Sequence, residues 1–222
     1  MISPVKRAYD ISSRRAQAER SRRNIIDSAR LLFIEQGYVA TSMRELASSA
    51  GVSLQTLYNA FESKYRLFSA VMDVIVAGDH DPVPLADRPA LRSIEEIDDP
   101  IEVIDATVAA ALPVLARMSE IFPVLRAAAA SDHEIAAGYQ QFVIEARHAD
   151  QRLTGERLDH LGALQRGVDA SHATDITWTV LSPDCFHLLV GLREWSEDEF
   201  AVWARRSLVA TLLGPDAAAR RR

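Results

Sequence analysis

The chain has 222 residues, of which 48% are hydrophobic, and this is enough to build one large core or two small ones. Its single cysteine, Cys185, excludes an internal disulfide and a cysteine-based zinc module, and it favours a reducing, cytoplasmic setting. No apolar run approaches the roughly 18 residues that span a bilayer, and no apolar segment follows the positively charged N-terminus. We therefore expect neither a membrane anchor nor a secretory signal.

The net charge of −6 is unevenly distributed along the chain. Residues 1–66 contain eleven Lys or Arg and six Asp or Glu (+5), whereas residues 67–222 contain fourteen and twenty-five (−11). A small basic unit joined to a larger acidic one indicates that the first meets a polyanion and the second does not.

Apolar residues recur at helical spacing throughout, and no convincing period-two strand occurs, so the sequence predicts an all-α fold. Residues 1–20 read as a flexible basic arm. The first helix is expected from about Ser21 to Gln36, with Gly37 just past its end.

Two short helices and a longer one follow. Ser42 and Glu45 have the spacing of a capping box, which predicts a helix from Ser42 to Ala50. Residues 51–53 then form a turn, and Ser53 caps a third helix that ends near Phe61. Ser63 is placed to cap a fourth helix over residues 64–77.

The second half of the chain, residues 67–222, is predicted to be helical beyond a connection at 78–99. That connection is mostly irregular, with a turn of helix near 93–97. Pro100 suits a first helical turn, and Pro113 predicts a kink or an early end. Further helices are expected over 120–129, 132–164, 171–195 with a break at 182–183, and 197–213, followed by a frayed tail from residue 217.

The helices at 42–50 and 54–61, joined by a glycine-containing turn, form a helix-turn-helix. Burial of Val52, Leu57 and Phe61 would hold the second helix from behind. The side chains left facing outward are Leu54, Gln55, Thr56, Tyr58 and Asn59. Such a helix reads base edges in the major groove with side chains near its N-terminus. We therefore predict a DNA-binding domain over residues 21–66.

The same residues resemble the DNA-binding domain of the TetR family of transcriptional regulators. The resemblance covers about residues 20–70 and rests on these segments, with their spacing preserved: Thr41–Ala47, Ala50–Ser53, Thr56–Tyr58, Phe61 and Ser63–Lys64. It implies an all-helical fold in which three DNA-binding helices precede a C-terminal helical bundle that binds a ligand and forms a dimer.

Residue roles carried over from the resemblance make Gln55 and Thr56 base readers, and Tyr58 and Lys64 phosphate contacts. They place Thr41, Ser42 and Arg44 at the phosphate backbone or groove edge. The chain departs from the family pattern at Gln55, where a small residue is common, and at Tyr65, where an acidic one is common. Both departures bear on which DNA sequence is read.

The basic residues before the first helix have two interpretations. Arg22 and Arg23, with Arg14, Arg15 and Arg20, would follow phosphates or enter a minor groove, or they form a solvated tail. We expect DNA contacts from Arg22 and Arg23.

For the second domain the resemblance implies a pocket for a small apolar ligand. The candidate wall residues come from separate predicted helices, and each also fits a plain core position. They are Met118, Phe122, His133, Tyr139, Phe142 and Trp178.

The resemblance also implies a homodimer through the last two helices, which places two reading helices on a palindromic DNA site. Packing inside one subunit is the other reading of the apolar residues there. They are Leu188, Leu189, Leu192, Phe200, Trp203, Leu208 and Leu212.

Other functions have less support. Cys185 reads as a small buried residue rather than a redox sensor, and the scattered histidines assemble no metal site. No phosphate-binding loop, nucleophile elbow or zinc-protease motif occurs, so we expect neither an enzyme nor a cofactor. The sequence predicts a dimeric regulator, most simply a repressor that a ligand releases from DNA. The alternative is a regulator controlled by a protein partner or by no small-molecule effector.

Overall fold

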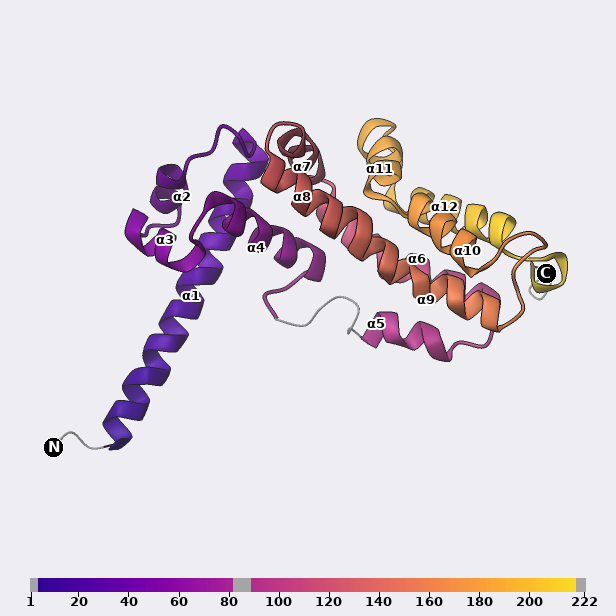
Figure 1. The fold of residues 1–222 in the computed structure, drawn as a ribbon, viewed down its shortest axis with the longest axis horizontal. Coiled ribbons are helices and arrows are strands. Elements are labelled where there is room, and N and C mark those ends of the chain that lie inside the picture. Colours follow the sequence, from indigo (N-terminus) through magenta and orange to yellow (C-terminus); the bar gives the residue numbers. More distant parts are fainter. Residues whose placement is uncertain (1–3, 82–88, 219–222) are drawn as a thin grey trace. The chain divides into compact units, whose positions relative to one another are not determined.

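The computed structural model describes residues 4–81 and 89–218, with all side chains except those of residues 4–15, 89, 90, 142, 216 and 218. The chain divides into two compact units, Met1–Val74 and Ile75–Arg222. Every regular element in the described ranges is a helix, which confirms the all-α class. Figure 1 labels the elements along the chain.

The first unit is built from α1 (Pro4–Gln36), α2 (Met43–Ser49), α3 (Leu54–Phe61) and most of α4 (Lys64–Ala77). Three aromatic rings lie at its centre, with the ring centroids of Phe33 and Tyr38 each 5.1 Å from that of Phe68. The buried residues around them are Ile25, Ile26, Ala29, Leu46, Leu57, Phe61, Leu67 and Val71. These side chains hold the short helices α2 and α3 against α1 and α4.

The second unit begins with the last turn of α4 and contains the remaining helices. They are α5 (Pro89–Arg92), the 3₁₀ helix η2 (Ser93–Glu96), α6 (Pro100–Met118), α7 (Phe122–Ala129), α8 (His133–Tyr139), the π-helix η3 (Gln140–Ala146), α9 (Arg147–His160), α10 (Ala170–Val180), α11 (Pro183–Phe186), the π-helix η4 (His187–Leu192), α12 (Glu197–Leu212) and α13 (Pro215–Ala218). Helices α6, α9, α10 and α12 pack side by side around one apolar core (Figure 1).

Close approach between α9 and α10 depends on a small residue. A Cβ atom added at Gly155 would lie 2.5 Å from the Ala170 carbonyl oxygen and 2.6 Å from Thr174 Oγ1. Nearby, the buried hydroxyls of Thr107 and Thr154 lie 2.8 Å apart and link α6 to α9. The core of this unit is therefore defined by contacts between residues far apart in the chain.

Most helix ends match the sequence-based expectations, and four features differ. The first helix begins at Pro4 instead of near Ser21, so the predicted flexible arm is helical from Pro4 onward. Helix α6 passes through Pro113 and ends at Met118, so the predicted early end is wrong. The run predicted over 132–164 ends near His160 and contains a π-helix, and the segment after Phe186 is also a π-helix.

The predicted connection at 78–99 contains α5 and η2, while its residues 82–88 lie outside the described part, as do residues 219–222 of the predicted frayed tail. Within that tail, residues up to Ala218 form α13. In the described ranges, no single helix is long and apolar enough to cross a membrane. By length and composition alone α6 and α7 would suffice as a pair, but they are bent by 68°.

Candidate nucleic-acid interface

Helix α2 begins with the predicted capping box. Ser42 Oγ accepts a hydrogen bond from the Glu45 amide at 3.2 Å, and the Glu45 carboxylate accepts bonds from the Ser42 amide at 2.8 Å and the Ser42 hydroxyl at 2.7 Å. The bonds from Ser42 to the charged carboxylate hold the pKa of Glu45 below its ordinary value. Leu46 and Ala47 are buried on the opposite face, so α2 is fixed in orientation as well as in length.

The turn into α3 follows from local chemistry. Gly51 has a φ of +65°, a conformation that glycine adopts without the steric cost of a Cβ atom. Ser53 Oγ then accepts a hydrogen bond from the Thr56 amide at 3.0 Å and caps α3. Leu57 and Phe61 are buried, which confirms that they hold α3 from behind.

The outward face of α3 is polar and accessible, as predicted. Its exposed side chains are Leu54, Gln55, Thr56, Tyr58 and Asn59. Gln55 Nε2 donates to Asn59 Oδ1 at 2.8 Å, and the Thr56 and Ser53 hydroxyls lie 2.7 Å apart. The side chains with hydrogen-bonding groups are thus partly ordered before any ligand is present, while their contact with DNA remains a prediction.

The predicted place of Thr41 on the DNA-facing surface is wrong for its side chain. Thr41 is 1% exposed, and its hydroxyl donates to the Gly37 carbonyl oxygen at 2.7 Å. Its position next to exposed Ser42 made it look accessible in the sequence, but the hydroxyl instead supports the turn that follows α1.

Lys64 has partners inside the first unit. Its ammonium donates to the carbonyl oxygens of Tyr38 at 2.9 Å and Thr41 at 3.1 Å, and it lies 4.2 Å from the centroid of the Tyr38 ring. These contacts tie the start of α4 to the segment between α1 and α2. A DNA contact from Lys64 is therefore a second role, and it stays a prediction.

The three arginines predicted to contact DNA differ in their surroundings. Arg22 donates to the Ala60 carbonyl oxygen at 3.0 Å and lies over the Phe61 ring, with its guanidinium carbon 4.2 Å from the ring centroid. Arg23 and Arg44 are exposed, and neither makes a polar contact with another described residue. Their charges are accessible to a polyanion.

Sequence reasoning missed one residue that positions this surface. Asn24 on α1 donates from Nδ2 to the Ala50 carbonyl oxygen at 2.8 Å, at the end of α2. Nothing in the local pattern distinguishes Asn24 from other polar residues on α1. Only the tertiary arrangement reveals its partner.

The predicted ligand-wall residues of the second unit fall into separate groups. Phe122 and Tyr139 come together with ring centroids 6.5 Å apart, and Met118 is buried like Phe122. His133 is exposed at the start of α8, so its prediction as a wall residue is wrong. The side chain of Phe142 lies outside the described part. Trp178 packs on His148, with ring centroids 6.2 Å apart, and its buried Nε1 has no hydrogen-bond partner among the described residues.

Charged groups surround Tyr139. Arg147 donates to the Leu181 carbonyl oxygen at 2.6 Å, and burial lowers the pKa of its guanidinium to about 10, against the opposing effect of nearby acidic groups. Arg126 and Asp184 form an ion pair at 3.0 Å. Burial raises the pKa of Tyr139, and the Asp184 charge adds to that rise, so this phenol remains a hydrogen-bond donor at neutral pH.

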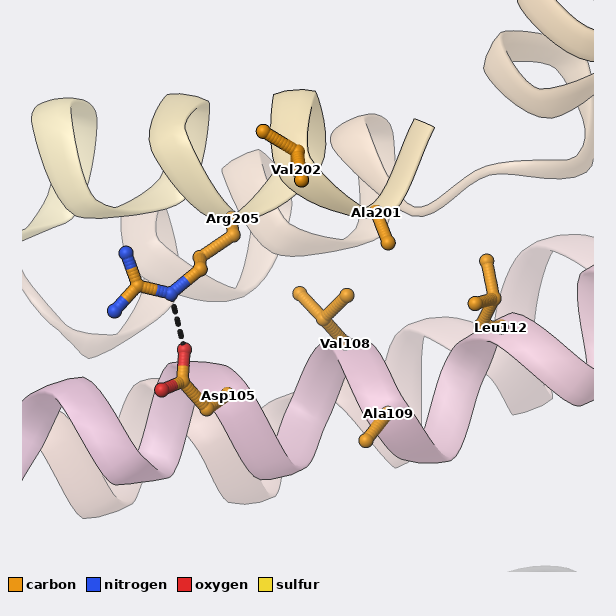
Figure 2. Close-up of a pocket in the computed structure, with 7 residues that line it drawn as sticks. All are labelled: Asp105, Val108, Ala109, Leu112, Ala201, Val202 and Arg205. Atoms are coloured by element: carbon orange, nitrogen blue, oxygen red, sulfur yellow. Dashed lines mark hydrogen bonds and ion pairs between the residues drawn. The ribbon is translucent and has the colours of Figure 1, made fainter. Parts of the chain in front are cut away.

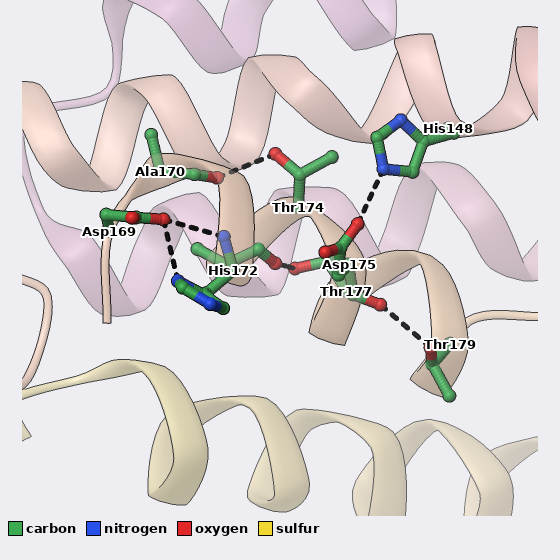
Figure 3. Close-up of polar contacts among 9 residues, drawn as sticks. His148, Asp169, Ala170, His172, Thr174, Asp175, Thr177 and Thr179 are labelled. Atoms are coloured by element: carbon green, nitrogen blue, oxygen red, sulfur yellow. Dashed lines mark hydrogen bonds and ion pairs between the residues drawn. The ribbon is translucent and has the colours of Figure 1, made fainter. Parts of the chain in front are cut away.

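Polar contacts lie along α10 and between α10 and α9, as Figure 3 shows. His148 on α9 meets Asp175 at 2.7 Å, and Asp169 accepts bonds from the amide and ring of His172 at the start of α10. The Thr174 hydroxyl donates to the Ala170 carbonyl oxygen at 2.8 Å. These contacts are local or bridge two packed helices, and we interpret them as structural.

A shallow groove of about 330 Å³ lies between α6 and α12 (Figure 2). Val108, Ala109, Leu112, Ala201 and Val202 line it with apolar groups. The ion pair of Asp105 and Arg205 forms one boundary in the same figure. None of the predicted ligand-wall residues lines this groove.

Comparison with known proteins places the first unit in a family. Residues 25–71 match the protein family described as "Bacterial regulatory proteins, tetR family". The HTH-type transcriptional regulator AcrR of Shigella flexneri is 38% identical over 58 residues, 26% of this chain and 27% of that protein. The HTH-type transcriptional repressor ComR of Escherichia coli strain K12 is 44% identical over 48 residues, 22% of this chain and 23% of that protein.

These curated relatives are therefore matched over only about a quarter of their own length. The likeness of fold extends further: a structure described as a SmeT–triclosan complex aligns with a TM-score of 0.69 over 89% of this chain and 93% of that one, at 16% identity. Matched segment, helix-turn-helix geometry and fold agree with the resemblance found in the sequence. Residues 25–71 of this chain match the tetR family of bacterial regulatory proteins, and the fold as a whole is similar to that of the SmeT structure.

Proposed function

We propose that this protein is a DNA-binding transcriptional regulator that reads a palindromic operator in the cytoplasm with the outward face of α3. One observation carries the proposal: a short capped helix, held from behind by Leu57 and Phe61, presents a row of exposed polar side chains beside accessible arginines. The similarity to AcrR and ComR falls in the same part of the chain.

The exposed residues have the chemistry that each role requires. Gln55 pairs with the edge of adenine through one donor and one acceptor, and the Thr56 methyl group fits against a thymine methyl. Tyr58 is 42% exposed, which leaves its hydroxyl accessible to a phosphate oxygen. Arg23 and Arg44 neutralise phosphates, which sets register rather than sequence preference.

The test is selection of duplex DNA by the full-length protein from a random-sequence library, followed by fluorescence anisotropy on the selected duplex and a scrambled one. We expect Gln55→Ala to weaken binding to the selected duplex by about tenfold or more and to leave the scrambled duplex unaffected. Arg44→Gln should weaken both. Arg166→Gln is the matched control, because Arg166 is exposed in the second unit and loses the same charge. Failure to enrich any sequence would contradict the proposal.

A homodimer would place two copies of α3 on the two half-sites. Phe200, Leu208 and Leu212, expected at the dimer interface, are buried inside their own subunit. Leu188, Leu192 and Val202 are instead 55%, 60% and 49% exposed, on η4 and α12. We place the dimer contact on these three residues. Leu188→Glu with Leu192→Glu should convert a dimer into a monomer in sedimentation velocity.

We further propose that a small apolar ligand releases the protein from its operator, and that the bound protein represses transcription. Buried Met118 and Phe122, with the Tyr139 ring packed against Phe122, would supply apolar and aromatic contacts to such a ligand, and the Tyr139 hydroxyl would supply a polar group. The SmeT structure contains triclosan, an apolar aromatic compound. Triclosan is therefore a first probe, and release of the selected duplex on its addition would support this part.

Coupling to DNA would run through α4, which continues from the first unit into the second. Arg117 on α6 donates from Nε to the Ile75 carbonyl oxygen at 2.8 Å and from Nη2 to that of Val76 at 2.9 Å, at the C-terminal end of α4. Met118 follows Arg117 directly. A ligand that shifts the end of α6 would thereby move α4 and change the spacing of the two reading helices, to the extent that it binds one arrangement more tightly.

The alternative is control by a protein partner, or no effector at all, with the second unit serving only assembly. Unchanged DNA affinity in the presence of apolar compounds, together with a dimeric state, would favour it. This alternative predicts the same loss of DNA affinity for Gln55→Ala. DNA binding and effector control are therefore tested independently.

A further inference from the structure

Arg22 contacts the C-terminal end of α3 from α1. Its Nη1 donates to the carbonyl oxygen of Ala60, the last residue but one of α3, at 3.0 Å. The carbonyls in the last turn of a helix lack partners within the helix and carry partial negative charge, so a cation there is favourable. The same guanidinium lies over the ring of Phe61, 4.2 Å from its centroid, and this adds a cation–π contact.

The end of α2, just before the turn into α3, is also held from α1. Asn24 donates to the Ala50 carbonyl oxygen at 2.8 Å, directly before the turn that leads into α3. Arg22 and Asn24 lie two positions apart on one helix, and between their contacts α3 rests on buried Leu57. Contacts from α1 therefore constrain the C-terminal end of α3 and the end of α2 that leads into it.

The charge of Arg22 also acts on a carboxyl of α4. Asp73 on α4 is partly desolvated, which raises the pKa of its carboxyl, and the Arg22 charge opposes this rise. Arg22 thus contacts α3 through a carbonyl and a ring. Arg23, the next residue, is exposed and makes no polar contact with another described residue.

We propose that Arg22 is a positioning residue that sets the orientation of α3 and thereby the sequence preference of the protein, and that it does not neutralise a phosphate. This inference rests on the proposed DNA-binding function and refines it. It reassigns a residue that the sequence alone placed among the DNA contacts. Arg22 influences which bases are read through the position of Gln55 and Thr56.

The two roles differ in their dependence on salt. Each phosphate that a cation neutralises releases counterions and adds about 0.9 to the slope of log affinity against log salt concentration. A residue that only positions α3 contributes nothing to that slope. Its loss instead reduces affinity for the preferred sequence while non-specific binding persists, because non-specific binding depends on charge.

The experiment compares Arg22→Gln with Arg23→Gln in the full-length protein. Binding is measured by anisotropy on the library-selected duplex and on a scrambled duplex, each about 30 base pairs, long enough to hold two half-sites. Salt is varied from about 50 to 200 mM. For Arg22→Gln we expect an unchanged slope, a loss of about tenfold on the selected duplex and no loss on the scrambled one. For Arg23→Gln we expect the slope to fall by about 0.9, with equal losses on both duplexes.

A fall of about 0.9 in the slope for Arg22→Gln, with equal losses on both duplexes, would overturn the inference. Arg22→Lys guards against a variant that merely unfolds, because lysine keeps the charge but lacks the planar group that covers Phe61. A positioning role predicts reduced preference for the selected duplex in Arg22→Lys, whereas wild-type preference in that variant would overturn it. If the wild-type protein selects no sequence at all, the proposed function fails instead, and this result is distinct from either outcome.

Discussion

Helix ends are set by local caps in both units, but the packing of the helices against one another is easier to infer for the first unit than for the second. In the first, the limits of α2 and α3 are set by neighbours in the chain: the Ser42–Glu45 capping box, the turn at Gly51 and the cap at Ser53. In the second, the packing of α9 depends on residues far away, as at Gly155, where the backbone of α10 leaves no room for a Cβ atom. Local signals allow the helices of the first unit to be predicted from the sequence. The arrangement of the helices in the second unit depends on long-range packing and cannot be predicted in the same way.

The largest expected effect tests the long-range contact. Gly155→Val should lower the free energy of unfolding of the second unit by about 3 kcal/mol, since the Ala170 carbonyl oxygen is backbone and moves only with its helix. Urea unfolding followed by tryptophan fluorescence is selective, because Trp178, Trp195 and Trp203 all lie in this unit.

Ala149→Val, at an exposed position of α9, is the control, with an expected cost of about 0.5 kcal/mol from helix propensity. Equal shifts for the two variants would mean that the close approach at Gly155 does not limit stability.

A smaller effect tests the local signal. Ser53→Ala removes the cap of α3 and should destabilise this helix by about 1 kcal/mol, because the Thr56 amide loses its acceptor. Hydrogen exchange should show faster exchange of α3 amides with little change in the second unit. Ser48→Ala, at an exposed position inside α2, is the control and should not accelerate exchange in α3. Equal acceleration by both variants would contradict a capping role for Ser53.

The smallest effect concerns a local device that both units share. Ser196 and Glu199 repeat the capping box at the start of α12, and hydrogen bonds from Ser196 lower the pKa of Glu199 as those from Ser42 lower that of Glu45. Because each folded-state pKa is lowered, the stabilisation is present above the ordinary value of 4.5 and is lost as pH falls through the lowered pKa.

Carbon-detected NMR titration of the two carboxyls should give pKa values below 4.5 for both. Ser42→Ala and Ser196→Ala should each return the affected value toward 4.5 without altering the other. A lowered pKa in only one unit would show that the capping box depends on its surroundings.

Much of the fold could be predicted from the sequence because its signals are short-range. Serine caps, the proline that starts α6 and the glycine after α1 each act within one helical turn, and the helix ends at these points agree with expectation. The start of α1 and the two π-helices were missed. Pro4 suits a first helical turn as Pro100 does, but the polar residues that follow it carry no clear apolar stripe. A π-turn adds one residue inside a helix without a cap or breaker to mark it.

In the candidate site, too, the features set by local patterns were predictable and those set by tertiary contacts were not. The outward face of α3 follows from helical periodicity once Leu57 and Phe61 are assigned to the core. The burial of Thr41 and the partners of Lys64 do not, because a backbone carbonyl has no signature in the sequence. His133 was misplaced for the opposite reason, since an amphipathic side chain at a helix start fits a pocket wall and the surface equally well.

The hydrogen bond between Gln55 and Asn59 has a kinetic and entropic consequence for recognition. Under the proposed function, a base edge must displace Asn59 from Gln55, so every DNA sequence competes with a bond already made. A matching adenine forms two hydrogen bonds with Gln55 and replaces the single bond to Asn59. A mismatched base gives no such gain, so Gln55 keeps its hydrogen bond to Asn59. Fixing a glutamine side chain costs roughly 1.5–2 kcal/mol of free energy through lost conformational entropy. Because Gln55 is already held by Asn59 in the free protein, part of this cost does not arise on DNA binding. We therefore expect a short residence time on non-matching DNA, and a longer one where an adenine replaces Asn59 as the partner of Gln55.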